Sequence, residues 1–171
     1  MSASSTSLLS SSSDFSSSSV DTNESIYCNE ANVSNLGEPQ NSYGYFGDNV
    51  CFGDVKITGK WIINWESGAE PVIVEFTNDG TVIPYDSNGN ADYNRSSIYW
   101  VSEDGMSLTY RYLFDADTSP NVFYHDYVER SETYPNWIKT MLVIYNSAYG
   151  SSSKFERWIC RINDEGISSC Y

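Results

Sequence analysis

Residues 99 to 114 read YWVSEDGMSLTYRYLF, which places two aromatic-rich arms on either side of a Ser-Glu-Asp-Gly turn. In the second arm Met106, Leu108, Tyr110 and Tyr112 alternate with residues that are mostly polar. Successive side chains of a strand point to opposite faces, so a period of two predicts a strand with one apolar face. The stretch is therefore predicted to be a β-hairpin.

Similar runs recur from residue 55 onward, with turn residues between them. "VIVEFT" and "TVIPYD" flank Asn78-Asp79-Gly80, which is a strong hairpin signal. Eight or nine strands are expected, and helical periodicity is hard to find. Consecutive hairpins imply an all-β, antiparallel up-and-down meander, and about eight such strands favour a closed barrel because closure removes exposed edges. A two-sheet β-sandwich would produce the same alternation and is the alternative.

Alternation also predicts which side chains point inward. Each predicted strand contributes one set of apolar residues spaced two apart, or nearly so. These sets are Trp61, Ile63 and Trp65; Val72, Val74 and Phe76; Met106, Leu108 and Tyr110; and Trp137, Met141, Val143 and Tyr145.

Composition divides the chain into three parts. Residues 1–25 are Ser-rich and predicted to form a flexible tether, because they cannot bury enough apolar surface to offset the entropy of ordering. Residues 26–54 contain many turn residues and aromatics and no Lys or Arg, and are interpreted as an irregular lead-in anchored by cysteine. Residues 55–171 are predicted to form the barrel domain and a C-terminal tail held by a disulfide.

The chain has four cysteines, Cys28, Cys51, Cys160 and Cys170, and none lies in a C-x-x-C motif. A zinc site is therefore poorly supported, whereas two disulfides formed in an oxidising compartment are typical of such spacing. Proximity in sequence favours the pairs Cys28–Cys51 and Cys160–Cys170. A pairing that joins Cys170 to the N-terminal segment is the competing possibility.

Charge limits the partners. With 23 acidic and 9 basic residues the formal net charge is −14, which disfavours nucleic acids and anionic membrane surfaces. No segment approaches the roughly 18 apolar residues of a membrane helix. We expect an extracellular, periplasmic or outer-membrane-associated protein whose export signal has been removed, since the first residues have neither a basic region nor a long apolar run.

Catalytic and metal motifs are weak. His125 and Asp126 are adjacent in a predicted strand, so their side chains should point to opposite faces and cannot pair. Strand carboxylates such as Glu75, Asp126 and Glu129 could serve a glycosidase, but in so acidic a chain most should face water. The loop from Asp86 to Asp92 spaces oxygen ligands as calcium loops do, yet lacks the expected Gly and Glu. A non-enzymatic protein without cofactor or resident metal is expected, with weak calcium binding left open.

The segment from Gly59 to Trp61 resembles the G-x-W signature that begins the lipocalin barrel. Phe76 before Asn78-Asp79-Gly80, and Trp100 before Asp104-Gly105 with Leu108 and Tyr110 after it, resemble the compact bacterial lipocalin-like domains of exported lipoproteins. The resemblance covers roughly residues 55–162. It implies that a late arginine, Arg157 or Arg161, packs on Trp61.

Taken together, these features predict a lipocalin-like barrel that binds a small apolar or amphipathic ligand or serves as a cell-envelope accessory protein. The alternative is a surface or assembly module, filament- or adhesin-like, that recognises glycans or self-associates through outward tyrosines. Whether the barrel is hollow or filled by its own aromatics is left open. The candidate ligand-binding residues are Trp61, Trp65, Phe76, Trp100, Tyr110, Arg111, Tyr112 and Trp137.

Overall fold

Tight glycine turns join the strands of this chain. Thr77 and Asp79 hydrogen-bond across the first turn, where Gly80 has a φ of 84°, and Ser102 and Asp104 do the same where Gly105 has a φ of 69°. Glycine tolerates these positive φ values because it has no Cβ. Both Asx-Gly signals therefore produce the expected hairpins.

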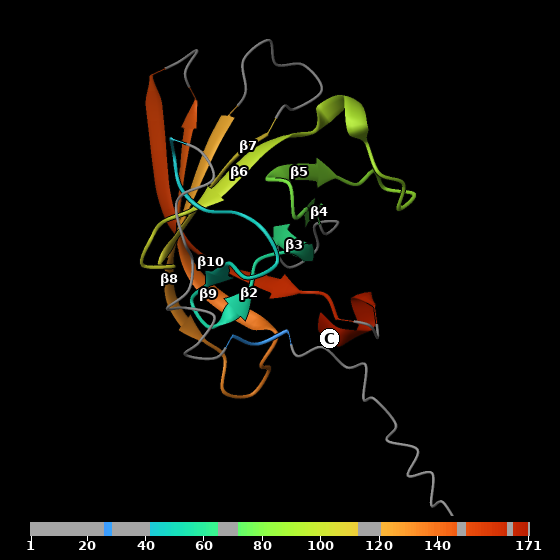
Figure 1. The fold of residues 1–171 in the computed structure, drawn as a ribbon, viewed down its shortest axis with the longest axis vertical. Helices are drawn as coiled ribbons and strands as arrows, with labels where there is room; N and C mark the ends of the chain where they lie inside the picture. The colour runs from blue at the N-terminus through green and yellow to red at the C-terminus, as the bar shows by residue number, and fades with distance from the viewer. Residues whose placement is uncertain are drawn as a thin grey trace, which may run out of the picture.

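In a computed structural model, eight strands form a closed antiparallel barrel in the order β10-β3-β4-β5-β6-β7-β8-β9 (Figure 1). The predicted barrel is thus confirmed over the sandwich. The structure describes residues 26–28, 42–64, 72–112, 121–146, 150–163 and 166–170. The strands are β3 (Gly59–Asn64), β4 (Val72–Phe76), β5 (Thr81–Pro84), β6 (Ser97–Val101), β7 (Ser107–Tyr112), β8 (Asn121–Arg130), β9 (Trp137–Asn146) and β10 (Ser151–Arg161).

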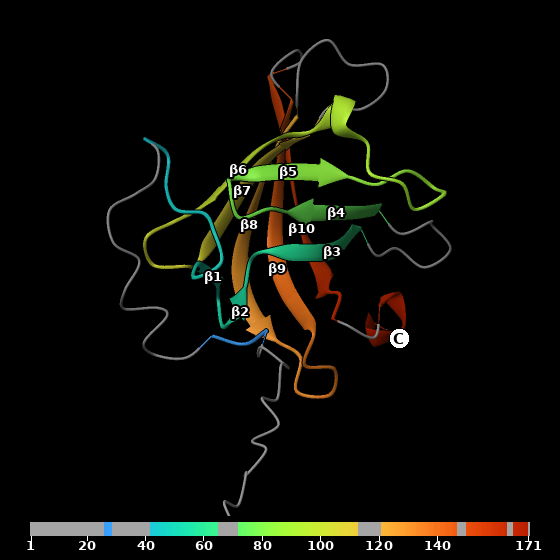
Figure 2. The same cartoon turned by 45° about the vertical axis from the view of Figure 1, so that its right-hand side comes forward.

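The barrel has a short half and a long half. Strands β3 to β6 have four to six residues each, whereas β8, β9 and β10 have 10, 10 and 11. In Figure 2 the short strands β3, β4 and β5 cross the long strands at a steep angle. Strand β10 pairs with β9 from Ser151 to Cys160, but with β3 only at Cys160 and Arg161. The closing seam is therefore confined to one end of the barrel.

The lead-in closes this same end. Strands β1 (Cys51–Phe52) and β2 (Val55–Lys56) form a small sheet that crosses the division predicted at residues 54 and 55. Tyr45 exchanges backbone hydrogen bonds of 2.9 and 2.8 Å with Val101, and Gly53 donates to the Gly105 carbonyl at 2.8 Å. The described part of the lead-in is thus packed onto the barrel. The predicted tether, residues 1–25, lies outside the described residues.

Aromatic and aliphatic side chains fill the interior at the lead-in end. The Trp61 indole is fully buried and donates from Nε1 to the Ile57 carbonyl at 2.8 Å. The Phe76 ring lies 4.9 Å from that of Tyr99 and 5.6 Å from that of Tyr110, edge to face. The other buried members of this core include Phe52, Val55, Ile57, Val74, Val82, Val101, Leu108, Phe123, Ile138, Leu142 and Ile159.

Both predicted disulfides, Cys28–Cys51 and Cys160–Cys170, are present. The second ties the short helix η2 (Ile167–Cys170) to the outside of β10. There Ile62, Cys160, Ile162 and Cys170 form a separate buried cluster against which Trp137 packs. The sheet is therefore covered on its outer face at this point as well as on its inner face.

The prediction of which β9 side chains point inward was wrong. Ile138, Thr140 and Leu142 are buried, whereas Tyr145 is 39% exposed and Trp137 points outward. Because the tail covers part of the outer face, β9 is apolar on both faces, and a period of two could not fix its phase. Met106 was also misplaced: it precedes β7 in the turn and is 41% exposed.

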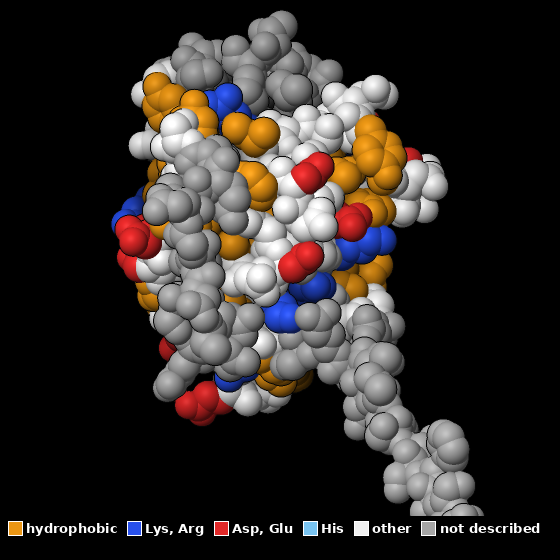
Figure 3. Space-filling view, viewed as in Figure 1, with side chains coloured by type: hydrophobic (Ala, Val, Ile, Leu, Met, Phe, Trp, Pro, Cys, Tyr) orange, Lys and Arg blue, Asp and Glu red, His pale blue; other side chains and the backbone are white. Residues whose placement is uncertain are grey.

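On the face drawn in Figure 3, apolar side chains are scattered among acidic and basic ones. A second short helix, η1 (Tyr93–Arg95), lies between β5 and β6. Among the described residues there is no helix with the length and apolar character that crossing a bilayer requires.

Trp61→Phe is expected to destabilise the fold by about 2–4 kcal/mol, because it removes both core volume and the hydrogen bond to the Ile57 carbonyl. Trp100→Phe is the matched control, since Trp100 is only half buried and lies on the outer face; it should cost less than about 1 kcal/mol. Urea unfolding measures both, and equal losses would contradict this role of Trp61.

Candidate functional site

A hydrogen-bonded polar chain crosses the interior of the barrel. His125 and Thr140 are fully buried among apolar side chains. The His125 ring lies with Nε2 3.1 Å from the Tyr110 hydroxyl and Nδ1 2.9 Å from the Thr140 hydroxyl. Thr140 donates in turn to the Arg157 carbonyl at 3.3 Å. Strands β7, β8, β9 and β10 each contribute one member.

These contacts determine the tautomer of His125. A threonine hydroxyl has one proton, and Thr140 uses it toward the Arg157 carbonyl, so His125 Nδ1 must donate to Thr140. Nε2 is then unprotonated and accepts from Tyr110. Every polar atom of the imidazole is satisfied without a charge. Burial accordingly lowers the pKa of His125 from 6.5 to about 3, because the charged form is desolvated.

Away from the lead-in and the closing seam, some inward side chains are only partly buried. Val72, Ile144 and Phe155 pack against the core but are only partly buried. Ile144 pairs in register with Phe123, which is 7% exposed and stacks on Tyr110 at 5.1 Å. We call Val72, Phe123, Ile144 and Phe155, together with Arg157, the mouth cluster.

Arg157 brings a positive charge to the mouth cluster. It pairs in register with Thr140, whose side chain points inward, and opposite residues of an antiparallel pair share a face. Its guanidinium carbon lies 4.3 Å from the centre of the Phe155 ring, a cation–π distance. Apolar walls with one positioned cation are suited to an amphipathic molecule that has an acceptor or anionic group at one end.

The structure does not bring the eight candidate ligand residues together. Trp61, Phe76 and Tyr110 share the interior and are at most 1% exposed, so they form packed core. Trp65 lies outside the described residues, and for Tyr112 only the backbone, in β7, is described. Three of the eight, Trp100, Arg111 and Trp137, are on the outer face.

The outward residues have different surroundings. The Trp100 ring stacks on Tyr43 of the lead-in, with ring centres 5.0 Å apart. Arg111 Nε is buried without a hydrogen-bond partner among the described residues. Trp137 lines a hollow beside the turn between β8 and β9. The prediction that Trp100 and Trp137 line the interior was wrong, because a tryptophan is large enough to be half buried on either face of a sheet.

The two arginines that the lipocalin resemblance indicated, Arg157 and Arg161, lie at different positions along β10. Arg161 is paired in register with Trp61 at the seam, and its guanidinium donates to the carbonyls of Lys60 and Ile162. A Cβ on Gly59, which has a φ of 109°, would come within 2.1 Å of Arg161 Nη2. Gly59 thus makes room for the arginine, whereas Arg157 lies further along β10, in the mouth cluster.

The strand carboxylates remain apart from His125. Asp126 is exposed and accepts from the Ser107 hydroxyl at 2.8 Å, on the face opposite to His125, as predicted from their adjacency. Glu75 accepts a hydrogen bond from the Tyr85 hydroxyl, and burial, followed by this contact, raises the pKa of Tyr85. Within the described part of the chain, no three His, Cys, Asp or Glu side chains converge on a metal-sized site.

The loop that resembled a calcium site uses its carboxylates internally. Asp86 Oδ1 accepts from the backbone N–H groups of Asn88 at 2.9 Å and Asn90 at 2.8 Å. These bonds, that from Asn90 foremost, lower the pKa of Asp86. Asp92 accepts from Asn94 N–H at 3.1 Å and from Arg95 Nε at 2.6 Å. The loop is thus an Asx-closed turn in which the acidic oxygens already have donors.

Reasoning from the sequence missed the mouth cluster and the role of His125. The alternation in "KFERWIC" does place Phe155 and Arg157 on one face, but it does not reveal which face points inward. His125 lies in register with Leu108 and Leu142, and its alternation with Phe123 was a usable signal. No known protein family, curated protein or solved structure matches this chain.

His125 predicts a specific acid sensitivity. The unfolded chain takes up a proton near pH 6.5 that the folded chain excludes until about pH 3. Stability from this group is thus fully present above pH 6.5 and falls below it, by at most about 1.4 kcal/mol per pH unit. His125→Gln should show a shallower decline between pH 6.5 and 4.5 in urea unfolding, and parallel curves would contradict the assignment.

Proposed function

We propose that this chain is an exported, non-enzymatic, lipocalin-like protein that holds a small apolar or amphipathic molecule at the mouth of its barrel. The observation that carries the proposal is the mouth cluster, where three inward apolar side chains are only partly buried and the Arg157 guanidinium lies over the Phe155 ring. Partly exposed apolar surface that faces inward is available to a ligand, whereas the packed end of the barrel is not.

Two regions of the interior have different tasks under this proposal. At the lead-in end, Trp61, Phe76 and Tyr99 are fully buried and support the fold. Further along, Ile144 and Phe155 present apolar surface that gains stability when a ligand covers it, by about 25 cal/mol per Å². The ligand would therefore enter only part of the barrel, which favours a short or folded apolar chain.

Arg157 orients the ligand. A guanidinium has five N–H donors in a planar arrangement that matches a carboxylate. The hydrogen bonds between the two groups are stronger where water is partly excluded. The guanidinium carbon of Arg157 lies 4.3 Å from the centre of the Phe155 ring, which helps to position the guanidinium. An acidic amphipath would therefore be preferred to a neutral molecule of equal length.

Three further observations support export and the family resemblance. Two disulfides are typical of an oxidising compartment. The −14 net charge keeps such a chain dispersed in a salty medium. The G-x-W tryptophan, Trp61, lies at the closed end of an eight-stranded barrel, directly opposite Arg161.

Surface recognition is a second candidate, because aromatic side chains are exposed on the outside of the barrel. Tyr93, Tyr43 and Tyr134 are 71%, 57% and 57% exposed. Tyrosines of this kind are enriched where proteins meet sugars or other subunits. A glycan-binding or self-associating role would use this outer surface.

Native mass spectrometry with oleate and oleyl alcohol tests the primary proposal. We expect one-to-one uptake of oleate, with weaker uptake of the alcohol. Phe155→Ala should weaken both ligands, whereas Arg157→Gln should weaken oleate about tenfold and leave the alcohol unchanged, since it removes one charge-assisted contact.

Tyr124→Ala is the control, because this strand residue is 41% exposed and alternates with the inward Phe123 and His125. It should bind both ligands as the parent protein does. No uptake of either ligand by the parent protein would end the carrier proposal. Sedimentation as a larger species at high concentration, without uptake, would favour self-association.

A further inference from the structure

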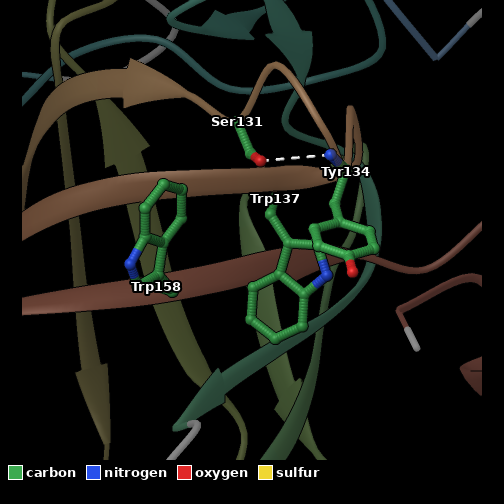
Figure 4. Close-up of a pocket in the computed structure, with 4 residues that line it drawn as sticks. All are labelled: Ser131, Tyr134, Trp137 and Trp158. Carbon is green, nitrogen blue, oxygen red and sulfur yellow. Dashed lines mark hydrogen bonds between the residues drawn. The ribbon is translucent and has the colours of Figure 1, made fainter.

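The hollow beside the turn between β8 and β9 lies outside the barrel and is independent of the mouth cluster. It encloses about 240 Å³ and is lined by Ser131, Tyr134, Trp137 and Trp158, here called the aromatic pocket. In Figure 4 the Trp158 ring stands at one side of the pocket, and the rings of Trp137 and Tyr134 stand at the other. Tyr134 is 57% and Trp158 37% exposed, so the rings are accessible from solvent.

The turn between β8 and β9 fixes the backbone that carries two of the three aromatic residues. Ser131 N–H donates to the Trp137 carbonyl at 2.9 Å, and Trp137 N–H donates to the Tyr134 carbonyl at 2.9 Å. Tyr134 N–H donates to the Ser131 hydroxyl oxygen at 3.1 Å, the contact dashed in Figure 4. The backbone that carries Tyr134 and Trp137 is therefore closed by its own hydrogen bonds.

The rest of the pocket stands on rigid elements. Trp137 packs against the cluster that contains the Cys160–Cys170 disulfide. Asn136, beside it, donates to the Ser169 carbonyl at 3.2 Å. Trp158 stands on β10, two residues before Cys160. Preorganised walls of this kind lose little entropy when a ligand binds.

Charge around the pocket favours a cation. Lys139 is opposite Trp158 in register, but it is held by Glu156 at 3.2 Å and Glu129 at 3.8 Å. This three-residue cluster carries one positive and two negative charges, so its sum is negative. Glu132 is exposed immediately after Ser131, and the whole chain carries −14.

The lining offers more hydrogen-bond donors than acceptors. The indole N–H groups of Trp137 and Trp158 can only donate, and the Ser131 hydroxyl oxygen already accepts from Tyr134 N–H. Aromatic side chains make up the rest of the lining that the structure describes. A primary ammonium would need acceptors for its three protons, and this lining supplies few acceptors. A methylated ammonium has no N–H to satisfy, and aromatic faces attract its positive charge.

We propose that the aromatic pocket binds a quaternary ammonium group. The faces of Tyr134, Trp137 and Trp158 attract the cation at short range, and the surrounding carboxylates attract it at longer range. This binding requires nothing from the interior of the barrel, so it stands whether or not the mouth cluster takes a ligand.

The test is an NMR titration that follows the tryptophan indole N–H signals. The probes are choline chloride and its neutral isostere 3,3-dimethyl-1-butanol, with chloride held constant by sodium chloride. We expect saturable shifts of the Trp137 and Trp158 signals with choline, and at least tenfold weaker binding of the neutral isostere.

Variants separate the pocket from general surface effects. Trp158→Ala should weaken choline binding at least tenfold, whereas Trp158→Phe should keep part of it because an aromatic face remains. Trp100→Phe removes a tryptophan elsewhere on the outer face and should bind choline as the parent does. Unchanged signals of the Trp61 indole show that each variant keeps its fold.

Three results would overturn the proposal. Equal binding of choline and the neutral isostere would reduce the pocket to an apolar hollow. Shifts with cellopentaose but not with choline would assign it to carbohydrate. Concentration-dependent dimerisation abolished by Trp158→Ala, without a choline effect, would assign it to a second copy of the chain.

Discussion

The whole barrel depends on a short seam between its first and last strands. Only Cys160 and Arg161 of β10 pair with β3, opposite Ile62 and Trp61. Inside the seam the Trp61 indole is tied to the Ile57 carbonyl, and outside it the Cys160–Cys170 disulfide holds the tail in place. So few ladder hydrogen bonds close the sheet that packing on both of its faces must supply much of the stability there.

Closure at one end leaves the rest of the interior less constrained. Near the seam the lead-in and the aromatic core exclude water. Burial keeps His125 neutral, and the Tyr110 and Thr140 hydroxyls satisfy its two ring nitrogens. Farther along, the long strands outreach the short ones, so Phe155 and Arg157 lie in a part of β10 that β3 does not reach. The packed core and the partly exposed inward side chains therefore lie at different ends of one barrel.

Packing on both faces of the sheet also explains the outer face of β9. A strand packed on both faces must be apolar on both, and β9 meets this demand with Ile138 and Leu142 inside and Trp137 outside. The tail and its disulfide cover one side of Trp137, while its other side helps to form the aromatic pocket. A tryptophan predicted to line the barrel is thus part of a separate pocket on the surface.

The sequence alone determined the all-β class, the glycine hairpins and the inward set of β4, and it favoured the two disulfide pairs that are present. These features depend on local turn chemistry, a period of two and short chain separations. It could not determine the phase of β9, where both faces are apolar, or that Phe155 and Arg157 of β10 point inward. Those features depend on where the sheet closes, and closure is set by contacts between β3 and β10, about a hundred residues apart in the chain.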